Sequence, residues 1–484
     1  MRRFSKKPLA AALLVLAAAV GVAGCSGGTQ RAGGRHQLQL TIGDILPLSG
    51  GQQPLAAPGQ KAADLAIAQI RRAVKEAKAD HTVTIKHVND RSDPQTSVAL
   101  AGALVRGGAS CLAGPWATAN VQGVAASISV PKKTLTITPS ASSDGLVHLQ
   151  VGGYLERTVT PDHLQGEALA NVIASELHGA KGKVVNVGAF KSIYGKGVAG
   201  DFAKAWKKLG GKVGAIVIYE SNLPSYEKEA KELTAKKPDA WVFADFADSY
   251  IKVSVELVRT HKWKASKTFV GDALAVATLP SNGAEITEGV RGVAPSAPLT
   301  TPDGRAFDNL YKSAPGPKYR QSFDAQNFDA VVLCYLSAVA AGSTKGRDMV
   351  RWVRKVSSPP GKKYSWRQLP EAIRALEGGQ DIDYQGASGP INIEPIQSDA
   401  GGNPTAGYYD VFRYRNGKLE IFGQTAVPGS GIVKIKPEVQ NPFPTPKVKK
   451  GATGATGASG ASGASGPTGK KNKQSKSKKS KSKG

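Results

Sequence analysis

The stretch from residue 82 to residue 144 alternates between apolar, strand-like runs and helical segments, with small polar loops between them. Three short apolar runs are predicted to form buried strands, at residues 82–87, 109–113 and 134–138. Two helices are predicted between them, at residues 95–106 and 119–127. Strands separated by helices favour a parallel sheet, because parallel neighbours need a long crossover connection. The stretch therefore predicts an α/β fold.

Small hydroxyl residues gather in the loops at the ends of these strands. Thr118 follows the second strand, Ser140 and Ser142 follow the third, and Trp116 comes just before Thr118. In open parallel sheets, ligands bind outside the carboxyl ends of the strands. We therefore expect these loops to line a binding site. The alternative role of each hydroxyl is to cap a helix or stabilise a turn.

The alternation covers most of the chain. A strand is predicted at residues 38–46, followed by a loop at 47–58 and a helix at 59–77. The pattern restarts after residue 157, with strands at 183–189, 213–219, 240–244 and 268–271 and helices at 164–178, 200–209, 225–236 and 249–261. Further on we predict a crossover near 290–297, helices at 302–314, 327–342 and 365–376, a strand at 389–393, and a hairpin at 408–413 and 419–422 around Asn416-Gly417.

A series of short motifs links the chain to a known family through their order and spacing. The motifs are Ile42-Gly43-Asp44-Ile45-Leu46-Pro47-Leu48-Ser49-Gly50, Asp90 with Ser92-Asp93-Pro94, Gly114-Pro115, Thr138-Pro139-Ser140-Ala141-Ser142, Arg157-Thr158-Val159-Thr160-Pro161-Asp162, Tyr194-Gly195, and Asn327-Phe328-Asp329-Ala330. With them the chain resembles the type I periplasmic binding proteins, specifically the branched-chain amino-acid receptors of ABC transporters (leucine/isoleucine/valine-binding-like). The resemblance spans roughly residues 39–423.

The resemblance implies two Rossmann-like lobes with parallel sheets, joined by three crossovers, that close on a ligand by hinge motion. It places residues 38–157 and 295–392 in the first lobe, and residues 158–294 and 393–436 in the second. The family members are binding proteins, so an amino acid or a similar small polar molecule is the expected ligand. An ABC permease is the expected protein partner.

The resemblance also assigns roles to polar residues of the cleft. Thr118 matches a position that binds the carboxylate of an amino acid. Ser140, through its backbone, and Ser142 match a second loop that binds the carboxylate and the ammonium. Asp272 follows a predicted strand and matches the acidic residue that pairs with the ammonium.

Aromatic residues complete the expected site. Tyr194 matches a wall residue of the family, and Phe246 is expected to face the ligand. Trp116 is large for its loop, and Leu55 stands where the family often has an aromatic or polar residue. These two departures leave the ligand's side-chain pocket unpredicted.

An enzyme is not expected. The run Gly195-Lys196-Gly197-Val198-Ala199-Gly200 matches the GxGxxG pattern of dinucleotide-binding loops. In those loops the first glycine follows the strand directly, whereas residues 190–194 intervene here. The sequence contains no HExxH, and its Cys and His residues do not cluster. We therefore expect no catalytic residues, no cofactor and no metal site.

The N-terminus predicts export. Basic residues precede an apolar run at 9–20 that is too short to span a membrane comfortably, so residues 1–24 are expected to be a signal peptide. The segment ends in Val22-Ala23-Gly24-Cys25, which resembles a lipobox, and Cys25 is the predicted lipidation site. An ordinary signal peptide with a chance cysteine is the alternative. Residues 25–37 are rich in Gly and Arg and predict a tether.

Two further cysteines, Cys111 and Cys334, lie in a predicted strand and a predicted helix. An exported protein permits a disulfide, but these two elements need not touch, so their pairing is left open.

The C-terminal segment, residues 437–484, is predicted to be a disordered tail. It contains prolines, Gly-x-y triplets at 451–468, and a lysine-rich end. The triplets contain too little proline for a collagen helix. The formal net charge is +27, and removing four leader charges and eleven tail lysines leaves about +12. Because an exported chain does not normally meet nucleic acid, anionic envelope polymers or lipid headgroups are the expected partners of this charge.

These observations together predict a lipid-anchored, extracytoplasmic solute-binding protein. Two alternatives remain open. One is a sensory receptor of the same fold without transport, and the other is an envelope-attachment protein that acts through its basic tail.

Overall fold

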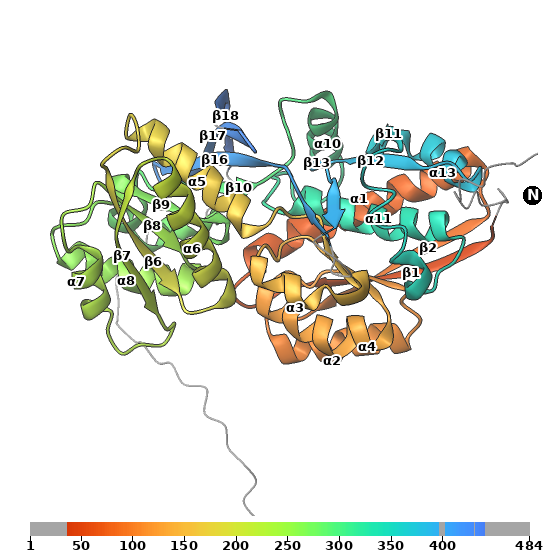
Figure 1. Cartoon of the computed structure of the whole chain (residues 1–484), viewed down its shortest axis with the longest axis horizontal. Coiled ribbons are helices and arrows are strands. Elements are labelled where there is room, and N and C mark those ends of the chain that lie inside the picture. Colours follow the sequence, from red (N-terminus) through yellow and green to blue (C-terminus); the bar gives the residue numbers. More distant parts are fainter. Residues whose placement is uncertain (1–35, 396–401, 430, 441–484) are drawn as a thin grey trace, which may run out of the picture. The chain divides into compact units, whose positions relative to one another are not determined.

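The computed structural model describes residues 36–395, 402–429 and 431–440. Figure 1 shows the two α/β lobes that the sequence predicted, each with helices packed against a central sheet. The first lobe contains a five-stranded parallel sheet in the order β2-β1-β3-β4-β5. Its strands are β1 (Leu38–Leu46), β2 (His81–Asn89), β3 (Cys111–Ala113), β4 (Leu135–Thr138) and β5 (Leu155–Arg157).

The second lobe contains an eight-stranded mixed sheet in the order β18-β17-β16-β10-β9-β8-β6-β7. The strands from β6 to β10 are parallel, and the last three are antiparallel. The bounds are β6 (Val184–Phe190), β7 (Lys212–Tyr219), β8 (Ala240–Ala244), β9 (Thr268–Val270), β10 (Arg291–Pro295), β16 (Gly407–Arg415), β17 (Lys418–Val427) and β18 (Ile432–Gln440).

Helices cover both sheets. Those of the first lobe are α1 (Gln53–Ala77), α2 (Pro94–Arg106), α3 (Thr118–Val124), α4 (Val130–Lys132), α10 (Pro302–Ser313), α11 (Asp324–Ala341), α12 (Gly346–Met349) and α13 (Leu369–Glu377). Those of the second lobe are α5 (Asp162–Glu176), α6 (Ile193–Lys208), α7 (Glu227–Leu233), α8 (Ala247–Arg259) and α9 (Ala284–Thr287). Two small sheets contain β11 (Lys362–Ser365), β12 (Ile382–Gly386) and β13 (Gly389–Pro390), and β14 (Ile393–Pro395) and β15 (Gly402–Pro404).

Successive residues of the central strands enter different cores, because side chains alternate between the two faces of a sheet. In β8, Val242 packs in the core that contains α5 and α6, whereas Trp241 and Phe243 pack in the core that contains α7 and α8. In β1, Ile42 packs with α1 and α11, whereas Ile45 packs with α2. Both faces of each sheet are therefore buried, as the apolar composition of the strands predicted.

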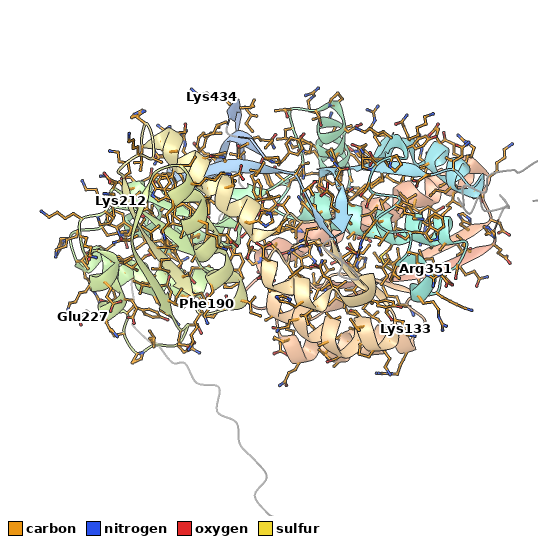
Figure 2. The ribbon with its side chains drawn as sticks, in the orientation of Figure 1. Lys133, Phe190, Lys212, Glu227, Arg351 and Lys434 are labelled. Carbon is orange, nitrogen blue, oxygen red and sulfur yellow. A yellow bond between two sulfur atoms is a disulfide. The ribbon has the colours of Figure 1, made fainter. Side chains whose placement is uncertain are left out.

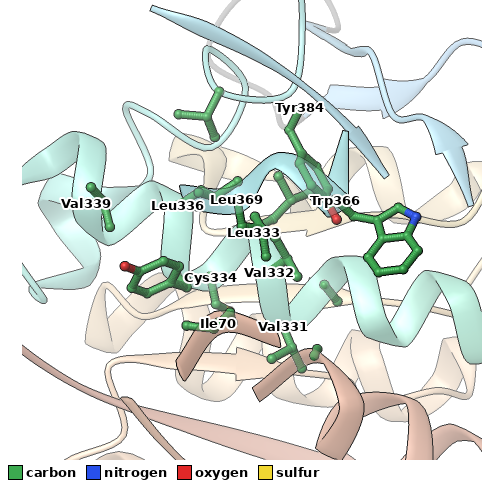
Figure 3. Packing of buried hydrophobic residues seen from close by; sticks show 14 of the residues in the cluster. Ile70, Val331, Val332, Leu333, Cys334, Leu336, Val339, Trp366, Leu369 and Tyr384 are labelled. Atoms are coloured by element: carbon green, nitrogen blue, oxygen red, sulfur yellow. The ribbon is translucent and has the colours of Figure 1, made fainter. Parts of the chain in front are cut away.

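Helix α11 runs through the main core of the first lobe. Every residue of this helix is buried, which agrees with its apolar composition on all faces. Figure 3 shows its side chains packed among Ile70 of α1, Leu369 of α13 and Trp366, which precedes α13. The helix also carries Cys334, whose sulfur is bonded to that of Cys111 in β3, with 5.9 Å between the two Cα atoms. The structure thus resolves the open question of the two cysteines in favour of a disulfide.

Several predicted boundaries were wrong. Helix α1 begins at Gln53 rather than residue 59, and α6 begins at Ile193 rather than residue 200, because prolines and glycines that suggested loops lie inside helices. The tail was expected from residue 437, but strand β18 extends to Gln440. The remaining tail residues, 441–484, and the predicted signal peptide and tether up to residue 35 lie outside the described residues.

His87 of β2 bridges two carboxylates. Its Nδ1 lies 2.7 Å from Asp44 Oδ2, and its Nε2 lies 3.0 Å from Asp64 Oδ1. Burial lowers the pKa of His87, but hydrogen bonds and charges of both carboxylates outweigh burial and raise it to about 9. This value exceeds that of an unfolded histidine, near 6.5. The bridge therefore stabilises the fold fully below about pH 6.5, and the stabilisation is lost as the pH rises through about 9.

We predict that His87→Gln lowers the free energy of unfolding by about 1–2 kcal/mol at pH 6, after allowance for solvent screening, and by much less at pH 10. Urea unfolding of both proteins at the two pH values measures the difference. An equal loss at both values would contradict the assigned role of the imidazolium.

Candidate functional site

A small chamber lies where strands of both lobes end. Its free volume is about 30 Å³, room for about two water molecules. Six of the seven residues predicted to bind the ligand line it, namely Trp116, Thr118, Ser140, Tyr194, Phe246 and Asp272. Thr118 and Ser140 follow strands of the first lobe, and the last three follow strands of the second. The structure thus brings these residues together, although they are spread over 157 positions of the sequence.

Asp272 provides the negative charge of this inner chamber. Its side chain is 2 % exposed, and Oδ1 accepts hydrogen bonds from Tyr194 Oη at 2.6 Å and from the Ala273 N–H at 2.8 Å. Burial raises the pKa of Asp272, and this effect exceeds the opposing effect of those hydrogen bonds. Burial and the nearby Asp272 charge also raise the pKa of Tyr194 well above its ordinary value. A cation beside Asp272 would offset the cost of burying this carboxylate.

Two hydroxyls face the chamber from the first lobe. Thr118 begins α3, and Ser140 follows β4; both are nearly buried. The preceding Thr138 shapes the second loop, because its hydroxyl donates to the Pro115 carbonyl at 2.7 Å and accepts from the Ala141 N–H at 3.2 Å. Within the described ranges, the Thr118 and Ser140 hydroxyls make no hydrogen bond with other residues, so both can bind a ligand.

Ser142, the seventh predicted residue, does not line the chamber. Its carbonyl accepts from Arg157 Nη1 at 2.7 Å and from the Asp162 N–H at 2.8 Å. The same Arg157 nitrogen donates to the Ser143 carbonyl at 2.9 Å. Through these hydrogen bonds the buried Arg157 side chain holds the loop that contains Ser140 and Ser142. Ser142 therefore lies behind the site rather than in it.

The apolar wall of the chamber is built around Trp116. The indole is fully buried and packs edge-on against Phe323, with 6.0 Å between the ring centroids. A Cβ added at Gly59 would lie 2.4 Å from the indole ring, so only glycine fits there. Phe323 has a φ of +72°, which bulky residues rarely adopt. Such backbone strain often marks a functional site.

A second, outer chamber of about 260 Å³ adjoins the first. The two share five lining residues, which are Gly51, Gln52, Thr118, Tyr194 and Phe246. The outer chamber is mostly apolar and includes Phe190, which is labelled in Figure 2. The Phe246 ring contacts both Phe190, at 5.8 Å between centroids, and Tyr194, at 5.4 Å. Tyr194 and Phe246 of this aromatic group therefore line both chambers.

Sequence reasoning missed several lining residues of the chamber, among them Gln52 and Phe323. Gln52 lies in a stretch that was predicted to be a loop without a role, and Phe323 precedes α11, far along the chain. Gln52 does follow a strand, because it lies in the loop between β1 and α1, but Phe323 does not, so the signal used for the other residues could have found only Gln52. The run before Gln52, rich in Gly and Ser, would have been a further local sign of a close approach to a ligand.

The glycines of the GxGxxG run serve helix packing. Gly195 and Gly197 lie inside α6 rather than in a loop. A Cβ at Gly195 would lie 2.2 Å from the Phe190 carbonyl oxygen, and one at Gly197 would lie 2.5 Å from Asp162 Oδ2. These close approaches explain the glycines without a phosphate ligand. In the part of the chain that the structure describes, no group of three His, Cys, Asp or Glu residues could hold a metal ion.

A larger hollow lies elsewhere, on the first lobe. It measures about 730 Å³ and is lined by residues of α1, α10 and α13, none of which was predicted to bind a ligand. Its charged side chains have both signs, and Arg367 already pairs with Asp303 at 3.4 Å. The inner chamber is smaller, but it lies at strand ends of both lobes and combines a buried charge with hydroxyls that have no hydrogen-bond partner among the described residues. We therefore take it as the candidate site.

Trp116 is expected to report ligand binding. Because its indole lines the inner chamber, a ligand there should change its emission, and Trp116→Phe should remove most of the ligand-induced fluorescence change. Trp206→Phe provides the matched control, since Trp206 is equally buried but belongs to the core around α6. A signal that survives in Trp116→Phe and disappears in Trp206→Phe would place the binding event elsewhere.

Comparisons with known proteins agree with this geometry. Residues 39–408 match the model of a family described as periplasmic binding protein. The structure resembles the leucine-binding protein LivK of Thermotoga maritima, with a TM-score of 0.61 and 20% identity over 80% of this chain and 98% of that one. It also resembles LivJ of Streptococcus pneumoniae in complex with isoleucine, with a TM-score of 0.61 and 19% identity over 82% and 100% of the two chains.

A third similar structure has a different ligand. It is an ABC-transporter solute-binding protein from R. palustris in complex with 4-hydroxybenzoate, with a TM-score of 0.58 and 16% identity over 83% of this chain and 97% of that one. A search of curated proteins found no match. At these identities the structural similarity concerns the fold, and the ligand differs from one similar protein to another.

Proposed function

Because the chain belongs to the periplasmic binding protein family, we propose that it binds an amino acid in the inner chamber, extending into the adjoining outer chamber, and delivers it to an ABC permease. The protein is an extracytoplasmic solute-binding receptor of the ABC-transporter type, and its family binds solutes rather than transforming them. One observation carries the choice of ligand. Buried Asp272 from the second lobe shares the chamber with the unpaired hydroxyls of Thr118 and Ser140 from the first.

An amino-acid zwitterion suits this arrangement. Its ammonium would donate to Asp272, and its carboxylate would accept from the hydroxyls of Thr118 and Ser140. Tyr194 would position Asp272 through their 2.6 Å hydrogen bond, while Trp116 and Phe246 would exclude water from the pair. Since each lobe supplies one half of the contacts, the ligand would favour the arrangement in which both lobes contact it.

A thermal-shift screen over the common amino acids, their amides and small aromatic carboxylates tests the proposal. A ligand that binds only the folded protein stabilises it by about 2.7 kcal/mol at a hundredfold excess over Kd. We expect at least one amino acid to raise the melting temperature in this way. If only carboxylates without an ammonium do so, the proposed ligand class is wrong.

We also propose that the protein is anchored through a lipid on Cys25, on the basis of the Val22-Ala23-Gly24-Cys25 sequence. Two acyl chains hold a protein stably at a membrane where one does not. No helix among residues 36–395, 402–429 and 431–440 is long and apolar enough to cross a membrane. Cys25→Ser should therefore release the protein from the membrane fraction or leave it unprocessed. Normal processing and retention of this variant would contradict the anchor.

The lysine-rich end supports a second attachment, to anionic polymers of the envelope. Any retention that remains in Cys25→Ser should then be salt-sensitive, because charge alone would provide it. Truncation after residue 446 should abolish this remainder without changing ligand affinity. Retention that resists both salt and truncation would exclude the tail as its cause.

A further inference from the structure

Two polar groups of the inner chamber are buried without a hydrogen-bond partner. The Trp116 indole is 0 % exposed, and its Nε1 has no partner among the described residues. The Oε1 atom of Gln52 is also buried and unpartnered within those ranges. Both side chains line the same chamber. Buried polar groups of native proteins are nearly always paired, and a buried indole N–H usually finds an acceptor.

Other tryptophans of the chain illustrate the rule. Trp241 Nε1 donates to the Leu233 carbonyl at 2.8 Å, and Trp206 Nε1 donates to the Lys212 carbonyl at 3.2 Å. Trp263 Nε1 shares the lack of a partner, but its ring belongs to the core of the second lobe and does not line the inner chamber. Trp116 therefore combines an unpaired donor with a place in the candidate site.

The Trp116 indole is also held where it is. Phe323 packs edge-on against the ring, and Leu55 and Val159 belong to the same apolar cluster. The backbone at Gly59 packs closely against the ring, since a Cβ added at Gly59 would lie 2.4 Å from it. These contacts hold the ring in place, so a ligand in the chamber is well placed to supply an acceptor for its N–H.

Gln52 supplies a complementary group. Its backbone N–H donates to Ser92 Oγ at 3.2 Å, which fixes the start of α1. Its side-chain amide carries both an acceptor and donors and lines the inner and outer chambers. Trp116 and Gln52 together therefore offer a donor and an amide to one small polar group of a ligand.

We propose that Trp116 and Gln52 select amino acids whose side chains carry a carbonyl or hydroxyl oxygen, in preference to hydrocarbon side chains of the same shape. This inference rests on the proposed function, because it assumes an amino acid in the chamber. A hydrocarbon side chain would leave the Trp116 indole N–H and the Gln52 amide oxygen buried and unpaired. Sites that are built to hydrogen-bond a ligand discriminate strongly against analogues that lack the polar group.

Isothermal titration of the whole protein with two matched ligand pairs tests the proposal. Asparagine and leucine have side chains of similar shape, as do threonine and valine, and the members of each pair differ in polarity. We expect asparagine to bind at least about tenfold more tightly than leucine, and threonine at least about tenfold more tightly than valine. Equal or tighter binding of leucine and valine overturns the inference and leaves the proposed function intact. Failure of every amino acid to bind overturns the proposed function itself.

Variants separate the role of the indole N–H from a general effect on folding. Trp116→Phe keeps an aromatic wall but removes the donor, so it should weaken the polar member of each pair about tenfold more than the apolar member. Gln52→Met keeps the length of the side chain and should reduce the preference in the same direction. Trp206→Phe should leave the preference unchanged, because Trp206 belongs to another core. If Trp116→Phe weakens the binding of all four ligands by the same factor, Trp116 shapes the chamber without selecting polar side chains, and the inference is overturned.

Discussion

Asp272→Asn is expected to weaken the binding of an amino acid by about two to four decades in Kd. Asp272 is buried, so its replacement by asparagine leaves a ligand ammonium without a counter-charge in a site that excludes water. Breaking such a buried pair by removing one partner costs about 3–5 kcal/mol, which gives the expected change in Kd. The shape of the site should survive, since asparagine can accept the same hydrogen bonds from Tyr194 and Ala273.

Calorimetry on the wild type and on three comparison variants measures this effect. Thr118→Ala and Ser142→Ala should each cost less, about 1–3 kcal/mol at most, because they remove neutral groups. Ser142 lies behind the chamber, so its loss should be the smaller of the two. Tyr194→Phe tests the positioning of the carboxylate. If Asp272→Asn binds as tightly as the wild type, the ligand carries no ammonium at this position.

The pH dependence of binding gives an independent check on the same carboxylate. Since burial raises the pKa of Asp272, the empty site takes up a proton at a higher pH than an ordinary aspartate does. A protonated Asp272 cannot pair with an ammonium. Affinity should therefore fall as the pH is lowered, and the fall should begin above the usual range of an aspartate and vanish in Asp272→Asn.

Removal of the Cys111–Cys334 disulfide is expected to lower the free energy of unfolding by about 2–5 kcal/mol. The bond joins residues 223 positions apart, and a cross-link that closes a long loop restricts the unfolded chain strongly. Both sulfurs are fully buried in the core of the first lobe, so the double variant Cys111→Ala/Cys334→Ala also loses packing. Denaturant unfolding of the wild type and the double variant measures the sum of these effects.

Treatment with a reductant separates the cross-link from the packing. Unfolding in the presence of dithiothreitol should destabilise the wild type and leave the double variant unchanged, because only the wild type has a bond to lose. If the reductant has no effect on the unfolding of the wild type, the two cysteines are not paired in solution. The small residual difference between reduced wild type and double variant would report the volume of the lost sulfur atoms.

Much of the fold could be predicted from the sequence, because buried strands have a strong local signal. Residues 38–46 and 240–244 were predicted with the bounds that the structure shows. The second is an apolar run between Asp239 and Asp245, and the first is rich in apolar and β-branched residues and ends at Pro47. The starts of α1 and α6 were wrong, because Pro58 and the glycines of α6 weaken the local preference for a helix. Tertiary packing, such as the fit of Gly195 against Phe190, decides those cases.

The candidate site was predictable to the extent that it follows strand ends. Thr118, Ser140 and Asp272 share that position, so a parallel sheet brings them to one edge of each lobe. Gln52 and Phe323 reach the chamber from the start of α1 and the residue before α11, which no local pattern relates to each other. Whether two buried cysteines pair is likewise a property of the assembled core, since β3 and α11 are distant in the sequence.

The threading of the chain between the lobes has a consequence for its synthesis. The sheet strands of the first lobe are complete by Arg157, but one of their faces is covered by α11, which ends at Ala341. In the second lobe, β10 pairs with β16, which is synthesised much later, and Arg291 lies opposite Arg413 in this pairing. Neither lobe can therefore finish folding on a growing chain until most of the protein has emerged. A chain with this topology remains incompletely folded during most of its translation. A fragment that stops before α11 should yield no folded first lobe.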